Sequence, residues 1–345
     1  MRRHQIDLWI ILSVIGLSIF GAFNLLGIRP DLLGNYLMFL FLGTVSFTIF
    51  FKLRMQFMRD NYIVLFFLFI ALFILTFVIG DDVRGAKRWI HLYFFNFQTS
   101  EFFKPFFLLI MASLLSTANR FTSRRFLATL VAFVLPLWLI FLQPDLGSAL
   151  MFLASFFVLV YFSGFSTKKL AYVFVVGIML LPFAWHILRP YQQLRIIGFM
   201  NPRVDPQGIT YNLNQAIITI GSGGIVGRGL GLSTQARHSF LPEYHTDFAF
   251  ASLVEQFGFI GGFAVITLYA ILLYRLVLLI FLQQNNLFKY LYLIGTLSFI
   301  ALGVFVNIGM NLGLLPVTGV ELPFISYGGS SVVSTMIMLG LALSK

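Results

Sequence analysis

A short segment near residue 240 concentrates ionisable side chains in a chain that is otherwise mostly apolar. The ten residues from His238 to Asp247 include Glu243 and His245, and an apolar stretch long enough to cross a membrane follows directly. Carboxylate and imidazole groups can take and give protons in a reaction, and charged groups at a bilayer boundary are costly unless they have a function. We therefore expect the functional site at this boundary.

Asp247 also has a structural interpretation. An Asp that precedes an apolar helix commonly accepts hydrogen bonds from the backbone N–H groups of the first turn, as an N-cap or first-turn residue. A cap does not require Glu243, His245 and Thr246 beside it, or Glu255 two turns deeper on the same expected helix. Their presence favours a functional role for the cluster.

A second charged group lies within an apolar stretch. Glu101 and Lys104 are three residues apart, so they share one face of a helix, where a charge is costly unless it is paired or hydrated. One interpretation is a buried ion pair that holds helices together. The other is that Lys104 also faces a cavity that receives an anionic headgroup.

Two further polar segments flank this pair on the expected outer side. Lys87, Arg88 and Trp89 could clamp a pyrophosphate, although Lys, Arg and Trp are also ordinary anchors at a membrane interface. Asp145 lies between two apolar stretches, and a helix N-cap explains its position well.

The elements that must position these residues are membrane-spanning helices. Hydrophobic residues make up 59% of the 345 residues, charged residues make up 10%, and the mean hydropathy is +0.93, values typical of an all-α integral membrane protein. We expect one polytopic domain over residues 1–345 with about ten spans, near 7–27, 33–51, 61–79, 101–117, 127–142, 146–163, 169–187, 248–273, 288–311 and 328–343. Pro105, Pro136 and Pro182 are possible kinks.

The distribution of charge predicts the orientation. With the N-terminus inside, the inner segments hold thirteen basic residues and the short outer loops hold four, namely Arg29, Arg84, Lys87 and Arg88. This bias predicts that both termini are cytoplasmic, and it accounts for most of the +11 net charge beside anionic lipid without a nucleic-acid partner. Ten of the twelve acidic residues fall on the outer side, all except Asp7 and Asp60, so the working face is expected outside.

One large outer loop, about residues 189–247, is expected between the seventh and eighth spans. Leu213, Ala216, Ile217 and Ile220 have the spacing of a short amphipathic helix. The glycines from Gly221 to Gly231 are expected to form flexible turns, because no strand precedes them and no Gly-Lys-Ser/Thr phosphate loop exists. The chain has no cysteine, which excludes disulfides and thiol chemistry.

Eight segments, in order along nearly the whole chain, resemble the SEDS family, and its elongation branch (RodA) more than its division branch (FtsW). They are Gly85–Ile90, Ser100–Lys104, Gln143–Leu150, Asn201–Pro202, Gly221–Gly224, Phe240–Phe248, Gly313–Gly319 and Leu322–Ser331. The resemblance implies a ten-span polymerase that builds glycan strands from lipid II at the outer face of the bacterial cytoplasmic membrane, releasing the undecaprenyl pyrophosphate that anchors the growing glycan.

The resemblance also implies roles for particular residues. Asp247 is then the essential acid, expected to take the proton from the acceptor hydroxyl, and Glu101 with Lys104 is the charged pair of the fourth span. Lys104, Arg88 and Arg195 are the candidates for stabilising the departing pyrophosphate. The full expected set of substrate-binding residues is Glu101, Lys104, Lys87, Arg88, Trp89, Asp145, Arg195, Glu243, His245, Thr246 and Ser326. A divalent cation, Mg²⁺ or Mn²⁺, is compatible with the outward acids, but the sequence defines no ligands for it.

Two alternatives belong to other classes. A lipid flippase would need charged groups through the full membrane depth, and the inner halves of the expected spans contain almost none; a scaffold would leave the clustered acids without a purpose. The family resemblance implies a class B penicillin-binding protein as partner. Small residues in the eighth and ninth spans would permit a helix of the partner to approach closely, or they serve packing within the bundle. These residues are Gly258, Gly261, Gly262, Gly295 and Gly303.

Overall fold

The computed structural model describes residues 7–83, 86–92, 95–116, 123–165, 190–201, 210–233 and 240–344, with 175, 185, 186 and 188. These residues fold as two compact units. The first comprises residues 1–41, 189–276 and 300–328, and the second comprises 42–188, 277–299 and 329–345. The single domain expected from the sequence stays a prediction.

Nine of the ten expected spans coincide with helices: α1 (Leu8–Ile28), α2 (Pro30–Lys52), α4 (Tyr62–Ile79), α5 (Thr99–Ser116), α6 (Ser123–Leu142), α7 (Leu146–Phe162), α12 (Ala249–Leu282), α13 (Leu287–Asn311) and α14 (Gly329–Leu343). In the described part of the chain, six are long and apolar enough to cross a membrane, and the apolar parts of α6, α7 and α14 are shorter. The expected span 169–187 lies almost entirely outside the described residues, as does Pro182. Pro105 and Pro136 lie inside α5 and α6.

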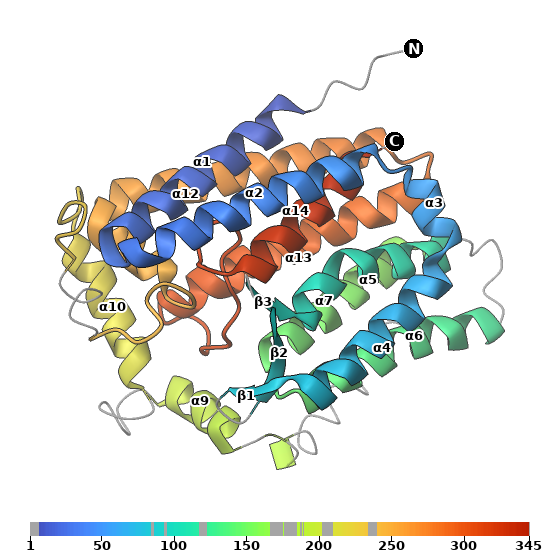
Figure 1. The fold of residues 1–345 in the computed structure, drawn as a ribbon, viewed down its shortest axis with the longest axis horizontal. Coiled ribbons are helices and arrows are strands. Elements are labelled where there is room, and N and C mark those ends of the chain that lie inside the picture. Colours follow the sequence, from blue (N-terminus) through green and yellow to red (C-terminus); the bar gives the residue numbers. More distant parts are fainter. Residues whose placement is uncertain are drawn as a thin grey trace. The chain divides into compact units, whose positions relative to one another are not determined.

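In the second unit α5 is the central helix. It packs against α4, α6, α7 and α14 (Figure 1), and large side chains on several of its faces, such as Phe103, Phe107 and Leu109, are almost fully buried. A helix that is apolar all round is covered either by neighbouring helices, as α5 is, or by lipid. By contrast α4 keeps most of its surface exposed, as a helix that faces lipid would. A short helix, α3 (Met55–Asp60), joins α2 to α4.

The connection between α4 and α5 forms a small sheet that the all-α prediction did not include. Its strands are β1 (Asp81–Val83), β2 (Ala86–Leu92) and β3 (Phe95–Gln98), antiparallel in the order β1-β2-β3. Trp89 pairs with Gln98 and Ile90 with Phe97; aromatic and β-branched residues of this kind favour strands. Because side chains alternate along a strand, Arg88 lies on the opposite face from Lys87 and Trp89. The three residues therefore cannot act as one clamp.

In the first unit α1 runs beside α12 (Figure 1), and polar contacts tie the two helices at both ends. Asn24 donates to Ala249 O at 3.1 Å and accepts from Gln256 Nε2 at 2.7 Å. At the other end Asp7 caps α1 and pairs with Arg275, whose Nη2 lies 2.6 Å from its carboxylate. Hydrogen bonds between neighbouring helices of this kind add specificity to apolar packing.

The large loop contains the expected amphipathic helix, α10 (Tyr211–Gly223), and a second helix, α9 (Pro190–Met200). Leu213 and Ala216 are buried as predicted, and Ile220 is partly buried. Ile217 is an exception, because 46% of it is exposed, and Thr219 is buried in its place.

The glycine-rich segment that follows α10 packs against a break in the helix α12. Gly258 has φ 68° and ψ −169°, so the expected eighth span is interrupted there. The glycine-rich segment pairs with the break through four backbone hydrogen bonds, including Gly229 N to Gln256 O at 3.0 Å and Phe259 N to Gly224 O at 2.9 Å. A Cβ on Gly227 would lie 2.2 Å from Gln256 O. These glycines are required for close backbone contact, which satisfies the groups that the broken helix leaves open.

Two features for which the sequence suggested a function also have structural roles. A Cβ on Gly295 would lie 2.4 Å from Leu108, and one on Gly262 would lie 2.9 Å from Val254, which agrees with the interpretation that these glycines serve packing within the bundle. Glu255 lies before the break, fully buried, and accepts hydrogen bonds from Ser222 and Ser233. It is therefore part of the junction with the glycine-rich segment.

Candidate functional site

Asp247 lies at the end of a tight turn that precedes α12. Glu243 has a φ of +53°, a left-handed conformation that is uncommon for a residue with a side chain. Its carbonyl accepts from the backbone N–H groups of Thr246 and Phe248 at 3.2 and 3.1 Å, and its carboxylate accepts from the Thr246 hydroxyl at 3.1 Å. The strained turn brings Glu243 and Thr246 together.

A second segment, residues 312–328, holds this turn in place. Ser326 Oγ donates to Thr246 O at 2.7 Å and accepts from Leu322 N at 2.9 Å, while Tyr327 N donates to His245 O at 2.8 Å. Ser326 was expected to bind substrate. Its hydroxyl is buried and engaged with the chain on both sides, which is the environment of a positioning residue.

Two asparagines of α13 hold the backbone of Asp247. Asn307 and Asn311 each donate to Asp247 O at 3.1 Å, and Asn311 Oδ1 accepts from Ala251 N at 3.0 Å. Asn311 therefore binds one of the N–H groups at the start of α12, and Asp247 itself lies one residue before the cap position. Sequence reasoning missed this pair, although two Asn side chains one turn apart in an apolar span are a detectable signal.

The Asp247 carboxylate is half-buried, and Gly319 borders it. Gly319 has φ +77°, and a Cβ there would lie 3.7 Å from Asp247 Oδ2. The apolar base of the site is a cluster formed by Ile28, Ala216, Leu241, Tyr244, Phe248 and Ala251. The buried face of α10 thus supports the turn that carries Asp247, and a glycine leaves space beside the carboxylate.

His245 is neutral at physiological pH in this environment. Burial lowers its pKa below the ordinary value, and the nearby Glu243 carboxylate opposes that shift only in part. Its Nδ1 atom is buried and, in the described part of the chain, has no hydrogen-bond partner. Arg195 of α9 is exposed, and its Nη1 donates to the carbonyl oxygen of Val317, a residue that packs against the apolar base of the site, at 3.3 Å.

The second unit contains the other predicted group. Lys104 Nζ lies 2.5 Å from Glu101 Oε1, and 13% and 9% of the two side chains are exposed. The buried ion pair is therefore present. Glu101 Oε2 is also buried and has no hydrogen-bond partner among the described residues, which leaves capacity for one more donor.

Asp145 is the centre of a buried polar cluster in the same unit. It caps α7 by accepting from Ser148 N at 3.2 Å, as the cap interpretation predicted. Its other oxygen accepts from Gln98 Nε2 at 3.0 Å and Ser100 Oγ at 3.2 Å. Arg88 Nη1 lies 3.7 Å from its carboxylate, and Arg88 Nε is buried without a partner in the described part of the chain.

The remaining predicted residues are Lys87, whose side chain is exposed, and Trp89, which is half-buried. Within the described ranges no group of three or more His, Asp or Glu side chains is arranged to hold a metal ion. The candidate residues therefore form two groups, one around Asp247 in the first unit and one around Glu101 and Asp145 in the second.

The helices define a class, a multi-pass membrane protein, and this one has carboxylates and cations buried or half-buried in both of its units. The particular family follows from the comparison with known proteins. Residues 5–344 match the family model FtsW/RodA/SpoVE, described as cell cycle protein, and the chain belongs to this family. It is the family that the sequence resemblance indicated.

Relatives and solved structures cover almost the whole chain. The probable peptidoglycan glycosyltransferase FtsW of Trichlorobacter lovleyi is 32% identical over 99% of this chain and 93% of its own length. The peptidoglycan glycosyltransferase MrdB of Escherichia coli K12 is 35% identical over 81% of this chain and 76% of its own length.

Among structures, a chain from a peptidoglycan synthase complex that coordinates polymerization and crosslinking matches with a TM-score of 0.83 and 30% identity, over 98% of this chain and 96% of that one. The rod shape determining protein RodA of Thermus thermophilus matches with a TM-score of 0.73 and 29% identity, over 98% of this chain and 95% of that one.

Proposed function

We propose that this protein is a peptidoglycan glycosyltransferase that polymerises lipid II into glycan strands at the outer face of the bacterial cytoplasmic membrane during cell elongation. Relatives named peptidoglycan glycosyltransferase, similar over most of the chain, support the activity. The outward bias of acidic residues and the inward bias of basic residues support the orientation, with both termini cytoplasmic.

Asp247 is the proposed general base. As the 4-hydroxyl oxygen of the acceptor sugar forms a bond to the anomeric carbon of the growing chain, Asp247 takes the hydroxyl proton. The bond from that carbon to the pyrophosphate oxygen breaks, and the polyprenyl pyrophosphate leaves with the electron pair. The observation that carries this assignment is the anchored backbone of Asp247, held by Asn307 and Asn311, beside the open position at Gly319.

Cationic groups are proposed to stabilise the leaving pyrophosphate, with Lys104 first, then Arg88 and Arg195. The support for Lys104 is its buried position beside Glu101, and the support for Arg88 is its own buried Nε, a donor with unused hydrogen-bonding capacity in the described part of the chain. Glu243, His245 and Thr246 are proposed to contact the sugars, and Ser326 to position the turn. Asp145 and its hydrogen-bond partners are proposed to orient Arg88.

The proposed partner is a class B penicillin-binding protein that crosslinks the new strand. Its support is the similar chain in a peptidoglycan synthase complex. Purified protein given lipid II in detergent tests the function directly, because a polymerase makes glycan where no bilayer exists to be crossed, and a flippase or scaffold makes none. Absence of glycan from a folded preparation, with and without the partner, would contradict the proposal.

A further inference from the structure

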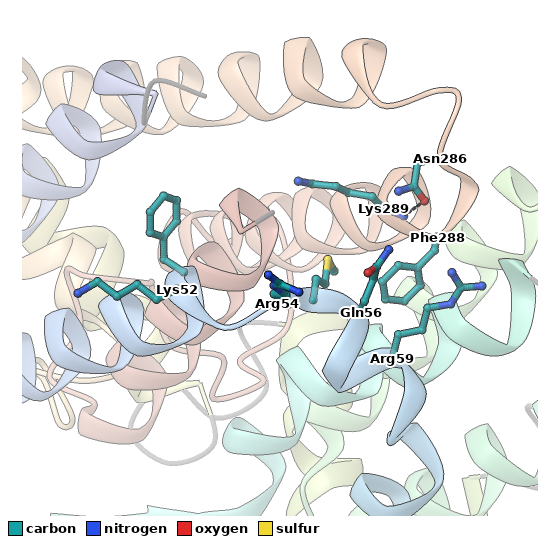
Figure 2. Close-up of a pocket in the computed structure, with 9 residues that line it drawn as sticks. Lys52, Arg54, Gln56, Arg59, Asn286, Phe288 and Lys289 are labelled. Carbon is teal, nitrogen blue, oxygen red and sulfur yellow. Dashed lines mark hydrogen bonds between the residues drawn. The ribbon is translucent and has the colours of Figure 1, made fainter. Parts of the chain in front are cut away.

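A cavity of about 630 Å³ lies in the second unit, and none of the residues assigned to catalysis lines it. Figure 2 shows the side chains around it, which come from the end of α2, from α3 and from the start of α13. Four of them are cationic: Lys52, Arg54, Arg59 and Lys289. A volume of this size is within the range of small-molecule sites.

The positive charge around this cavity is uncompensated. None of the four cations lies within 4.0 Å of a carboxylate in the described part of the chain, and no acidic residue lines the cavity. Two of them are held by neutral groups instead. Lys289 Nζ donates to Ser344 O at 2.5 Å, and the Arg59 guanidinium lies 5.0 Å from the centre of the Phe288 ring.

The positive-inside bias explains why basic residues occur on this side of the membrane. It does not by itself explain why four of them line one cavity, where a bound anion would lower their mutual repulsion. Arg and Lys are the side chains that bind phosphate groups, Arg through paired N–H donors and Lys as a point charge.

The surroundings of the cavity indicate the source of that phosphate. It lies where two membrane-spanning helices end, and large apolar side chains of the same unit are exposed on the adjoining elements: 61% of Phe57, 63% of Phe281 and 74% of Leu282. An occupant with an anionic head and apolar tails matches both features, and basic pockets between helices on the cytoplasmic side suit such headgroups. We propose that this cavity binds the phosphate headgroup of an anionic phospholipid of the inner leaflet.

The test uses the whole protein in nanodiscs of equal parts phosphatidylglycerol and phosphatidylethanolamine, with retained lipids identified by native mass spectrometry. The wild type should retain phosphatidylglycerol preferentially. In the triple variant Lys52→Gln, Arg54→Gln, Arg59→Gln this preference should be at least about tenfold weaker. The reason is that each cation near a membrane surface contributes about a factor of five to the affinity for anionic lipid. Lys289 is left intact because it also bonds Ser344.

Two controls separate this site from general charge and from misfolding. The charge-conserving variant Lys52→Arg, Arg54→Lys, Arg59→Lys should keep the preference. The variant Arg3→Gln, Lys168→Gln, Lys169→Gln removes as much charge from segments that the sequence places on the same side, and it should also keep it. Equal lipid retention by the wild type and the first triple variant, or equal loss in the last control, would overturn the proposal.

A further arm distinguishes the source of the anion. In zwitterionic detergent, added phosphatidylglycerol should raise the Tm of the wild type and not that of the triple Gln variant, and inorganic phosphate at the same concentration should have a smaller effect. If inorganic phosphate stabilised the wild type as much as the lipid did, and the triple variant lost both effects, the cavity would be a site for soluble anions and the lipid assignment would fail.

Discussion

Two partners, Asn307 and Asn311, hold the backbone carbonyl of Asp247, while the residue itself is only half-buried. Asp247→Asn keeps the backbone carbonyl that Asn307 and Asn311 bind, but an amide cannot take a proton. We predict that glycan synthesis from lipid II falls by about 100-fold or more, with an unchanged Tm. The matched control is Asp31→Asn, which removes an exposed outer carboxylate paired with Arg29 and should retain activity. Normal polymerisation by folded Asp247→Asn would exclude it as the base.

The lowered pKa of His245 predicts that the stability of the protein depends on pH. Because burial lowers the pKa of His245 below its ordinary value, the unfolded chain binds a proton at higher pH than the folded chain does. Its contribution is therefore complete above about pH 6.5 and is lost as the pH falls below that value. Thermal unfolding in detergent between pH 7.5 and 5.5 should show a smaller loss of Tm for His245→Gln than for the wild type. The exposed His186 provides the control: if His186→Gln gave the same change, the effect would not come from His245.

Substitutions of Glu101 and Lys104 distinguish a structural role of the ion pair from a role in substrate binding. Glu101→Gln or Lys104→Met alone leaves one buried charge without its partner and should cost roughly 3–5 kcal/mol of unfolding free energy. The double variant removes both charges and should recover stability without recovering polymerisation, because the lysine proposed to contact pyrophosphate is gone. Unfolding curves and the lipid II assay decide this together. Recovery of both properties would assign the pair a purely structural role.

At the scale of elements, the break in α12 and the glycine-rich segment form one unit of structure. Gly258→Ala and Gly227→Ala should each cost about 1–3 kcal/mol from the backbone conformation alone, and more from the overlap with backbone atoms 2.2–2.3 Å away. Gly221→Ala is the matched control in the same segment, since nothing lies within 4 Å of the added Cβ. Equal Tm values for all three variants would show that the pairing seen at the break does not contribute to stability.

At the scale of the whole molecule, polymerisation and partner binding should be separable. We predict that the cognate transpeptidase raises glycan output when co-purified with the wild type. Asp247→Asn should co-purify equally well but give no increase, because the substitution keeps the size of the side chain and removes only the proton acceptor. Gly262→Leu and Gly295→Leu would not test partner binding cleanly, because the added side chains would overlap Val254 and Leu108 within this protein. Loss of co-purification in Asp247→Asn would show that the turn belongs to the partner interface.

The sequence by itself determined the class, the number and limits of most helices, and the residues where chemistry is concentrated. These properties depend on local features: the length of an apolar stretch against the thickness of a bilayer, the side of the membrane on which basic residues fall, and unusual residue types close together in the chain. The predicted limits of α1, α4 and α13 differ from the observed ones by one residue at most, because the ends of an apolar stretch can be read from the sequence.

Only the tertiary structure decided how those residues are held. Asn307, Asn311 and Ser326 bind the turn of Asp247 from segments 60 to 80 residues away. Gly227 and Gly258 meet through the backbone, and Asp145 is shared among Arg88, Gln98 and Ser100. Backbone and side-chain hydrogen bonds of this range depend on which segments the fold brings together, and a pattern along the chain does not contain that information. The same polar residues could have faced lipid, solvent or each other until packing fixed their partners.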